Sequence, residues 1–209
     1  MYCSKEREAK NDGAWQCVGA AVGVIEELRV DIKASVFVAT SLDGFIARKD
    51  GNLDWLGNTG EEGKEDFGFR AFMDSVDVLV MGRHSYEKVV TFGAWPYGEK
   101  PVVVLSSRTV EVPALLRKTV SSSSETPREV VVRLSAQGAS HLYVDGGITI
   151  QRFLDADLID EITITRIPVL IGEGIPLFGR LAKDVSLVHR STRVFDNGYV
   201  QSTYGVARS

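Results

Sequence analysis

Short apolar runs of strand length recur along the chain from residue 33 onward. We expect strands at four of them, at residues 35–39, 76–81, 102–105 and 141–144. Nearly continuous apolar runs of this length are typical of strands that are covered on both faces. Segments of helical length, such as 65–75 and 85–91, lie between them. This alternation predicts an α/β domain with a mainly parallel sheet and right-handed crossovers.

One apolar run carries helix signals in place of strand signals. Residues 130–132 are all valine, yet Thr126 precedes a proline and is followed three residues later by Glu129. This spacing is that of a capping box with proline in the first turn, so we predict a helix over 127–137. Gly138 fits its left-handed terminator.

The pattern changes after residue 160. Residues 161–167 alternate between polar and apolar side chains, and two further strands are expected near 186–190 and 199–206. The Asn-Gly pair at 197–198 is a hairpin signal, so this end of the sheet is predicted to be antiparallel. The four serines at 121–124 are interpreted as a solvated loop. No internal repeat is visible.

Composition narrows the function classes. The chain has 209 residues, of which 44% are hydrophobic and 25% charged, which suits one globular domain with a small appendage. Its 24 basic and 28 acidic residues give a net charge of −4, which argues against a nucleic-acid partner. The two cysteines, Cys3 and Cys17, form neither a disulfide framework nor a zinc motif. We therefore expect no metal and a reducing, cytoplasmic location.

The first 30 residues are expected to be an N-terminal extension to a domain that occupies residues 31–209. Their longest apolar run, 17–25, has nine residues, whereas a membrane-spanning helix needs about 20. The charges before that run balance, because lysine and arginine alternate with acidic residues. A secretion signal is therefore not expected, and neither is a membrane partner.

Three segments that follow predicted strands carry groups suited to anions. At 82–87, Gly82 allows close backbone approach, and Arg83 and Ser85 stand at a helix start. A simpler interpretation is that Arg83 is exposed and Ser85 caps the helix. At 105–108, two serines and an arginine follow a strand and could hold a ribose phosphate.

The third segment, Gly146 and Gly147, connects a strand to a helix and leaves backbone N–H groups free. It also fits a plain tight turn, and the GxGxxG fingerprint is absent. Because ligands of open α/β sheets bind beyond the carboxyl ends of the strands, the joint position of the three segments predicts a dinucleotide site on one rim.

Five segments together resemble the dihydrofolate-reductase-like superfamily. They are residues 39–47, 81–87, 104–107, 144–147 and 167–172. The nearer match is the branch that contains the reductase domain of the riboflavin-biosynthesis deaminase/reductase enzymes, and it spans Lys33 to Val206. The resemblance implies a three-layer dihydrofolate reductase fold, with a mainly parallel mixed sheet, helices on both faces and a C-terminal antiparallel hairpin. It also implies NADPH as the hydride donor and a homodimer.

The resemblance assigns cofactor contacts to particular positions. Those expected near the adenosine and phosphates are Gly82, Arg83, His84, Ser85, Leu105, Ser106, Ser107, Gly146, Gly147 and Ile148. Ala39 and Ile46 match positions that flank the nicotinamide. Arg83, or alternatively Arg108, would favour NADPH over NADH through its 2′-phosphate. The other histidines, His141 and His189, fall in predicted strands and suggest no metal site.

The proton donor is expected among the acidic residues of the segment that would cover the nicotinamide. Asp43 and Asp54 are the candidate catalytic residues, since a carboxyl that is partly buried there would have a raised pKa. Each has a structural alternative, because Asp43 precedes a glycine as in a turn and Asp54 could cap a helix. Trp55 is expected to pack.

The substrate is expected to be a small heterocycle, either a pyrimidine sugar phosphate or a pterin. The carboxylate of classical dihydrofolate reductases is replaced by Gly60, which is followed by Glu61 and Glu62, and this argues against folate. The H-x-E and P-C-x-x-C motifs of the zinc deaminase domain are absent. The sequence thus predicts an NADPH-dependent reductase. The alternatives are dihydrofolate reductase activity and a non-catalytic nucleotide-binding module of the same fold.

Overall fold

The computed structural model describes residues 32–57 and 65–207. The predicted N-terminal extension, Cys3, Cys17 and the segment with Gly60, Glu61 and Glu62 lie outside the described residues. No helix in the described parts of the chain is long and apolar enough to cross a membrane.

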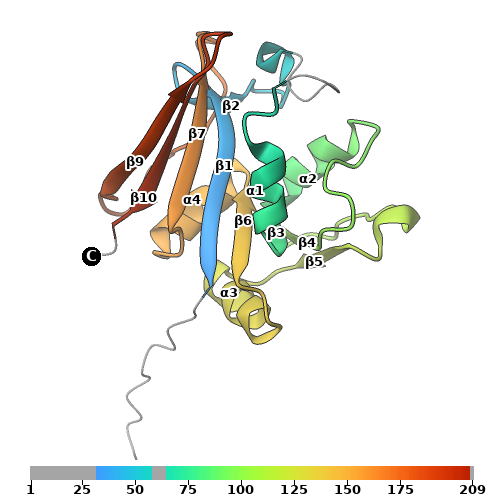
Figure 1. The fold of residues 1–209 in the computed structure, drawn as a ribbon. Coiled ribbons are helices and arrows are strands. Elements are labelled where there is room, and N and C mark those ends of the chain that lie inside the picture. The colour runs from blue at the N-terminus through green and yellow to red at the C-terminus, as the bar shows by residue number, and fades with distance from the viewer. Residues whose placement is uncertain (1–31, 58–64, 208–209) are drawn as a thin grey trace, which may run out of the picture.

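An eight-stranded mixed sheet forms the centre of the molecule (Figure 1). Its strands, in spatial order, are β5 (Val120–Ser123), β4 (Val102–Leu105), β3 (Val78–Gly82), β6 (His141–Asp145), β1 (Lys33–Ser41), β7 (Glu161–Ile167), β10 (Val200–Val206) and β9 (Leu187–Val194). The first six run parallel. Strand β10 is antiparallel to β7, and β9 is antiparallel to β10. The predicted fold class is confirmed.

Helices cover both faces of the sheet (Figure 1). Helices α3 (Pro127–Ala136) and α4 (Gly147–Asp155) pack on one face, which we call the α4 face, and bury side chains such as Val130 and Phe153 against the strands. Helices α1 (Phe69–Ser75) and α2 (Arg83–Val90) pack on the other, the α1 face, through Met73 and Tyr86. The result is the three-layer arrangement that the sequence predicted.

Smaller elements lie at the carboxyl ends of the strands and at one edge of the sheet. Strands β2 (Phe45–Ala47) and β8 (Ile175–Pro176) form a separate two-stranded sheet. Two short 3₁₀ helices complete the set, η1 (Asp54–Leu56) and η2 (Ala114–Leu116).

The helix expected at 127–137 is confirmed. The Thr126 hydroxyl accepts from the Glu129 amide at 3.4 Å, and the Glu129 carboxylate accepts from the Thr126 amide at 2.8 Å. Gly138 ends the helix with φ of 92°. The capping signals therefore outweigh the strand preference of the valines, two of which, Val130 and Val131, are buried against the sheet.

Two local predictions need correction. The serines at 121–124 are not a loop, because residues up to Ser123 form β5, which pairs with β4. As an edge strand it exposes most of its side chains, so it lacks the apolar signal. The helix expected from 65 begins at Phe69, since Phe67 and Gly68 adopt positive φ values of 56° and 84°. The Asp66 carboxylate holds this turn by accepting from the Gly68 and Arg70 amides.

The C-terminal hairpin is present as predicted. Gly198 at its tip has φ of 83°, a conformation that favours glycine. Strand β9 starts one residue later than expected and continues to Val194, so it is longer than the sequence pattern indicated.

Candidate cofactor and active site

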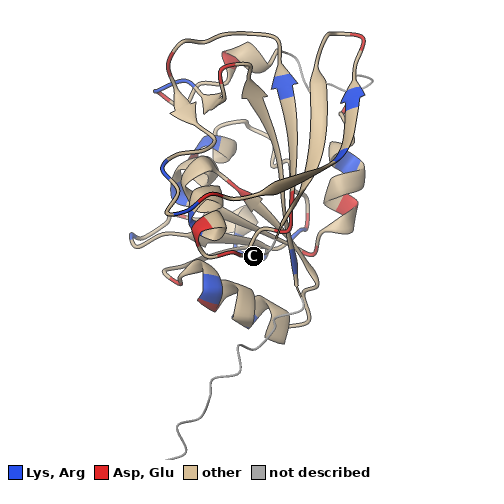
Figure 2. Cartoon of the chain, turned by 90° about the vertical axis from the view of Figure 1, so that its left-hand side faces the viewer, with Lys and Arg blue, Asp and Glu red and all other residues tan. Residues whose placement is uncertain are grey.

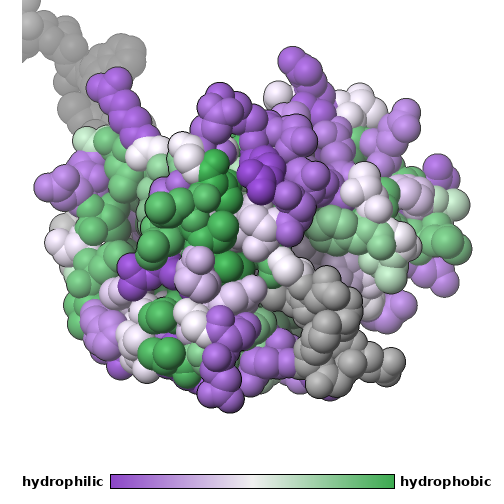
Figure 3. Space-filling model, turned by 90° about the horizontal axis from the view of Figure 1, so that it is seen from above, coloured by the Kyte–Doolittle hydropathy of each residue, from purple (hydrophilic) through white to green (hydrophobic). Residues whose placement is uncertain are grey.

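The three predicted anion-binding segments meet at one rim of the sheet. Met81 of β3 lies opposite Asp145 of β6, and Gly82 lies opposite Leu105 of β4. The segments that follow these three neighbouring parallel strands therefore leave the sheet side by side. Figure 3 looks down on this rim and shows hydrophobic surface next to strongly hydrophilic surface. The arrangement suits a ligand with both phosphates and apolar rings.

The backbone of two segments approaches very closely. Gly146 has φ of 89°, and a Cβ atom there would overlap the Ser85 hydroxyl. A Cβ atom at Gly82 would lie 2.8 Å from the Thr149 hydroxyl, closer than real contacts allow. Both glycines are therefore needed for packing, and they bring the starts of α2 and α4 together.

Two helix N-termini converge at this point. The N-cap residues of α2 and α4 are Gly82 and Gly146, and neither helix has a side-chain capping bond. The alternative interpretation that Ser85 caps α2 is therefore wrong. First-turn N–H groups have no acceptor within their own helix, so those of α2 and α4 could bind an anion, and the two dipoles place partial positive charge at the same rim.

Arg83, which was predicted to bind the 2′-phosphate, already forms an ion pair. The Arg83 guanidinium donates to Glu87 at 2.6 Å, and it lies 3.3 Å from the ring nitrogen of His84. The His84 side chain is 77% exposed. An incoming phosphate at Arg83 would have to compete with the Glu87 carboxylate, which weakens the case for this residue as a free cation.

The β4 segment is a local turn. The Ser106 hydroxyl accepts from the Arg108 amide at 3.0 Å and donates to the Arg108 carbonyl at 2.7 Å. Ser107 and Arg108 are exposed. Of the two predicted serines, Ser107 is the one that presents its side chain to solvent at the rim.

The residues predicted to flank the nicotinamide come from two directions. Ala39 belongs to β1, where it lies opposite Thr165 of β7. Ile46 belongs to β2 and packs against the start of α4, since a Cβ atom at Gly147 would lie 3.2 Å from its side chain. Ile148, next along the helix, is 60% exposed, an unusual position for an isoleucine. The structure thus brings Ile46 next to the glycine pair.

The Asp43 carboxylate links two loops, and its pKa is not raised, contrary to the sequence prediction. Its carboxylate accepts from the Ser41 hydroxyl at 2.6 Å and from the Ile171 and Gly172 amides at 3.3 and 2.8 Å. These bonds, with Ser41 the strongest, hold the pKa of Asp43 below its ordinary value. Asp43 joins the turn after β1 to the loop before β8.

Asp54 also departs from the prediction. Its two carboxylate oxygens accept from Arg48 at 2.6 and 3.0 Å, and this ion pair lowers the pKa of Asp54. The side chain is 53% exposed and does not cap η1. Trp55 packs as expected, at 9% exposure, and its indole N–H has no hydrogen-bond partner within the described part of the chain.

Asp145 is a further candidate that the sequence patterns did not single out. Asp145 ends the central strand β6, and burial raises the pKa of its carboxyl, with the Gly146 amide partly opposing this shift. Its charge also acts on Tyr97 and Tyr143, whose hydroxyl pKa values are raised mainly by burial. The place of Asp145 at the end of a predicted central strand could have indicated this environment, because neighbouring strands enclose such residues on both sides.

A row of polar side chains continues from Ala39 across the α1 face. The Gln201 amide donates to the Thr165 hydroxyl and to the Phe67 carbonyl, both at 2.9 Å. The Thr163 and Thr203 hydroxyls bond to each other at 3.0 Å. Hydrogen-bonding groups therefore line the side of the sheet next to the expected nicotinamide position.

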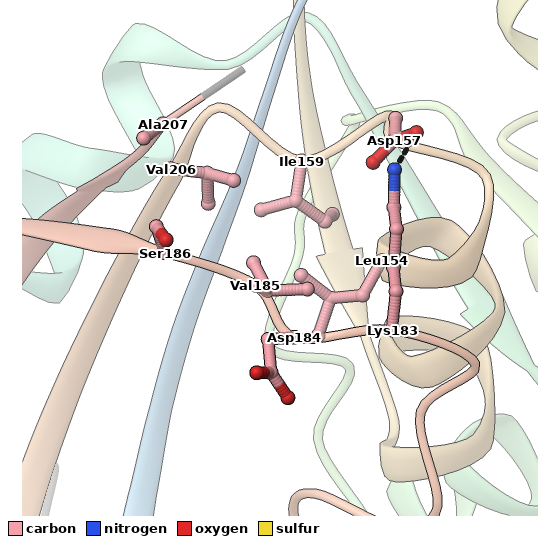
Figure 4. A pocket seen from close by; sticks show the side chains of 9 residues that line it. All are labelled: Leu154, Asp157, Ile159, Lys183, Asp184, Val185, Ser186, Val206 and Ala207. Carbon is pink, nitrogen blue, oxygen red and sulfur yellow. Dashed lines mark hydrogen bonds and ion pairs between the residues drawn. The ribbon is translucent and has the colours of Figure 1, made fainter. Parts of the chain in front are cut away.

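A cavity of about 230 Å³ lies at the opposite end of the sheet (Figure 4). It is lined by Leu154, Asp157, Ile159, Lys183, Asp184, Val185, Ser186, Val206 and Ala207. An ion pair of 2.8 Å between Lys183 and Asp157 stands at its side. Because these residues adjoin the start of β7 and the end of antiparallel β10, the cavity is separate from the carboxyl rim.

Two known proteins are similar to this chain over most of its length. The uncharacterized protein YwjB of Bacillus subtilis is 36% identical over 165 residues, which cover 78% of this chain and 92% of that protein. A crystal structure described as a putative riboflavin biosynthesis protein from Shewanella sp. PV-4 has a TM-score of 0.79 and 44% identity, with 85% of this chain and all of that chain covered.

A more distant structure confirms the fold. Dihydrofolate reductase from Enterococcus faecalis, complexed with NADP(H), has a TM-score of 0.58 at 18% identity and covers 84% of this chain and 97% of its own. The RibD C-terminal domain family matches residues 33–201, nearly the whole described domain. The chain therefore belongs to the RibD C-terminal domain family.

Proposed function

We propose that this protein is an NADPH-dependent reductase that transfers hydride to a small heterocycle, a pyrimidine sugar phosphate or a related ring. Its family and its likeness to a reductase support an oxidoreductase of the riboflavin-pathway type. The observation that carries the proposal is the convergence of two uncapped helix N-termini at Gly82 and Gly146. Helix N-termini bind anions, so this geometry would suit the phosphates of a dinucleotide.

The residues at the rim fit such a cofactor. The amides at the starts of α2 and α4, with the Ser85 hydroxyl between them, would hold the pyrophosphate. Ala39 and Ile46 would form the apolar wall beside the nicotinamide ring, which supplies the hydride when it is bound. Exposed Ile148 would be covered by the same ligand.

The substrate side would use Asp145 as its proton source. A carboxyl with a raised pKa keeps a proton to a higher pH than Asp43 or Asp54, whose pKa values are lowered. Asp43 is assigned a positioning role, because it fixes the loop before β8. The polar row with Thr165 and Gln201 would bind the edge of a heterocycle.

One sequence feature disfavours folate as the substrate. Gly60 stands at the position where classical dihydrofolate reductases carry a carboxylate. Together with the likeness to a riboflavin biosynthesis protein, this favours the pyrimidine over the pterin.

The test is cofactor binding followed by turnover. NADPH should raise the melting temperature of the purified protein by the linkage between binding and folding, and NADH should do so less. Oxidation of NADPH should then be seen with an aminouracil sugar phosphate and not with dihydrofolate. No thermal shift at millimolar NADPH would overturn the proposal. Binding without turnover on any pyrimidine or pterin would instead support the non-catalytic module.

A further inference from the structure

Strand β9 is a long edge strand that nothing in residues 32–57 and 65–207 covers. All eight of its residues, Leu187 to Val194, are exposed, and the strand contains no proline. The opposite edge strand, β5, has four residues. Long, open edges are ready to pair with another strand, and proteins usually block them with proline, outward lysine or short length.

The cations of β9 do not guard its edge, because they fold back over their own chain. A Cβ atom at Gly205 would lie 2.9 Å from the Arg190 guanidinium, so this side chain crosses the neighbouring strand β10. Arg193 stands 4.4 Å over the Phe195 ring and 3.3 Å from Glu65. Figure 2 turns this side of the molecule toward the viewer.

The only histidine of the strand is held in the same way. The His189 ring lies 5.6 Å from the Tyr204 ring, and its Nε2 atom is 2.7 Å from the Thr192 hydroxyl. Leu187, Val188 and Val194 meanwhile remain 41%, 47% and 69% exposed. The edge thus combines open backbone groups with uncovered apolar side chains.

The pairing with β10 fixes which face each β9 side chain occupies. The register skips Arg190 at an irregularity, so the alternation changes there. The side chains on the α4 face are Leu187, His189, Thr192 and Val194, and those on the α1 face are Val188, Arg190, Ser191 and Arg193.

We propose that β9 pairs antiparallel with β9 of a second copy of this chain about a twofold axis between residues 190 and 191. The opposed pairs are then Leu187 with Val194, Val188 with Arg193, His189 with Thr192, and Arg190 with Ser191. In every pair both side chains lie on the same face, and no two cations oppose each other. Apolar residues meet at both ends of the ribbon.

Neighbouring registers lack this match. A shift of one residue places paired side chains on opposite faces, except at the centre, where Arg190 or Ser191 opposes itself. A shift of two residues in one direction places Arg190 opposite Arg193, and in the other it places His189 opposite Arg190, which lies on the other face. The irregularity at Arg190 therefore selects one self-complementary register. Since β9 lies far from β3 and β4 in the strand order, the dimer leaves the cofactor rim open.

The test uses charge at the predicted Leu187–Val194 contact, with molar mass from light scattering. The unmodified full chain should be a dimer at micromolar concentration. L187K/V194K places lysine opposite lysine and should give monomer, whereas L187E/V194K places opposite charges together and should remain a dimer. Both positions are exposed, so circular dichroism and melting temperature should change little.

Ser122→Lys on β5 is the matched edge control and should leave the molar mass unchanged. The proposal is overturned if the unmodified chain is monomeric, if L187K/V194K stays dimeric, or if the two double variants dissociate equally. NADPH binding measured in parallel should be the same for the monomeric variant, which separates this inference from the proposed reductase function.

Discussion

The two halves of the carboxyl rim are built differently. At β3, β4 and the start of α4, the backbone determines the shape of the rim, because Gly82 and Gly146 allow the starts of two helices to touch. From the end of β6 through β1 to β2, carboxylates hold the rim, and each has a separate environment. Asp43 is bonded to amides, Asp54 is bonded to an arginine, and Asp145 is half-buried at the end of β6, where desolvation raises its pKa.

The difference shows where sequence reasoning is reliable. A glycine that precedes a helix has one physical meaning, close backbone approach, wherever it stands. A carboxylate takes its pKa from its surroundings, so the same residue type becomes a clamp, an ion pair or an acid. The backbone half should therefore control cofactor affinity, and the carboxylate half should control turnover.

Asp145→Asn should have the largest effect. Removing a general acid costs about 10²- to 10⁴-fold in kcat, while the dissociation constant for NADPH should change little. In the parent protein, kcat should fall as pH rises through the raised pKa, and this limb should vanish in the variant. Steady-state kinetics across pH with separate NADPH titrations provide the measurement. Full activity in Asp145→Asn would place the proton source elsewhere.

The stability of the same variant has a definite sign. Because the folded-state pKa of Asp145 is raised, its favourable contribution is present at low pH and is lost as pH rises through that value. Asp145→Asn removes the cost of burying the charge, so the variant should gain stability relative to the parent at alkaline pH. Urea unfolding at two pH values would measure this.

Gly146→Ala should come next, with about a 10- to 100-fold loss in NADPH affinity, an estimate that allows for about 1–2 kcal/mol of backbone strain and the overlap with Ser85. Gly138→Ala is the matched control, because Gly138 has nearly the same φ but open space around it. The control should lose stability without losing affinity. Equal NADPH affinity in the two variants would mean that the close approach at Gly146 is unimportant for the cofactor.

The sequence predicted most of the fold because its signals are local. The valine-rich strands, the Thr126 capping box and the Asn-Gly hairpin each specify their own element. It failed at Ser121 and Ser122, whose strand exists only because β4 offers an unpaired edge. Pairing of this kind depends on a distant segment and leaves no periodic pattern behind.

The candidate site divides in the same way. The meeting of Gly82, Ser85 and Gly146 followed from their positions after parallel strands. The partners of Asp43 and the raised pKa of Asp145 did not, because they depend on contacts from other segments, such as the amide of Gly172, 129 residues away along the chain. Sequence spacing cannot supply such contacts.

Asp43→Asn should have a moderate effect through positioning. An amide replaces one carboxylate acceptor, so the bonds to Ile171 and Gly172 weaken and the loop before β8 loosens. We expect a rise of about 3- to 10-fold in KM for the substrate with a smaller change in kcat, consistent with a loss of about one charge-assisted hydrogen bond. Because the pKa of Asp43 is lowered, the same loosening should appear in the parent as pH falls through that value. A loss confined to kcat would contradict the positioning role.

Asp54→Asn should have the smallest effect. It tests whether Asp54, which the sequence suggested only by its position in the segment, takes part in catalysis. Its ion pair with Arg48 is exposed on both sides, so water and salt screen it, and such pairs contribute little. We expect kcat and KM within about twofold of the parent, as for a surface substitution. Arg48→Gln removes the other half of the pair and should match it. A large loss of turnover in Asp54→Asn with normal turnover in Arg48→Gln would show that the Asp54 carboxylate reaches the substrate. Asp54 would then have a catalytic role, which its lowered pKa argues against.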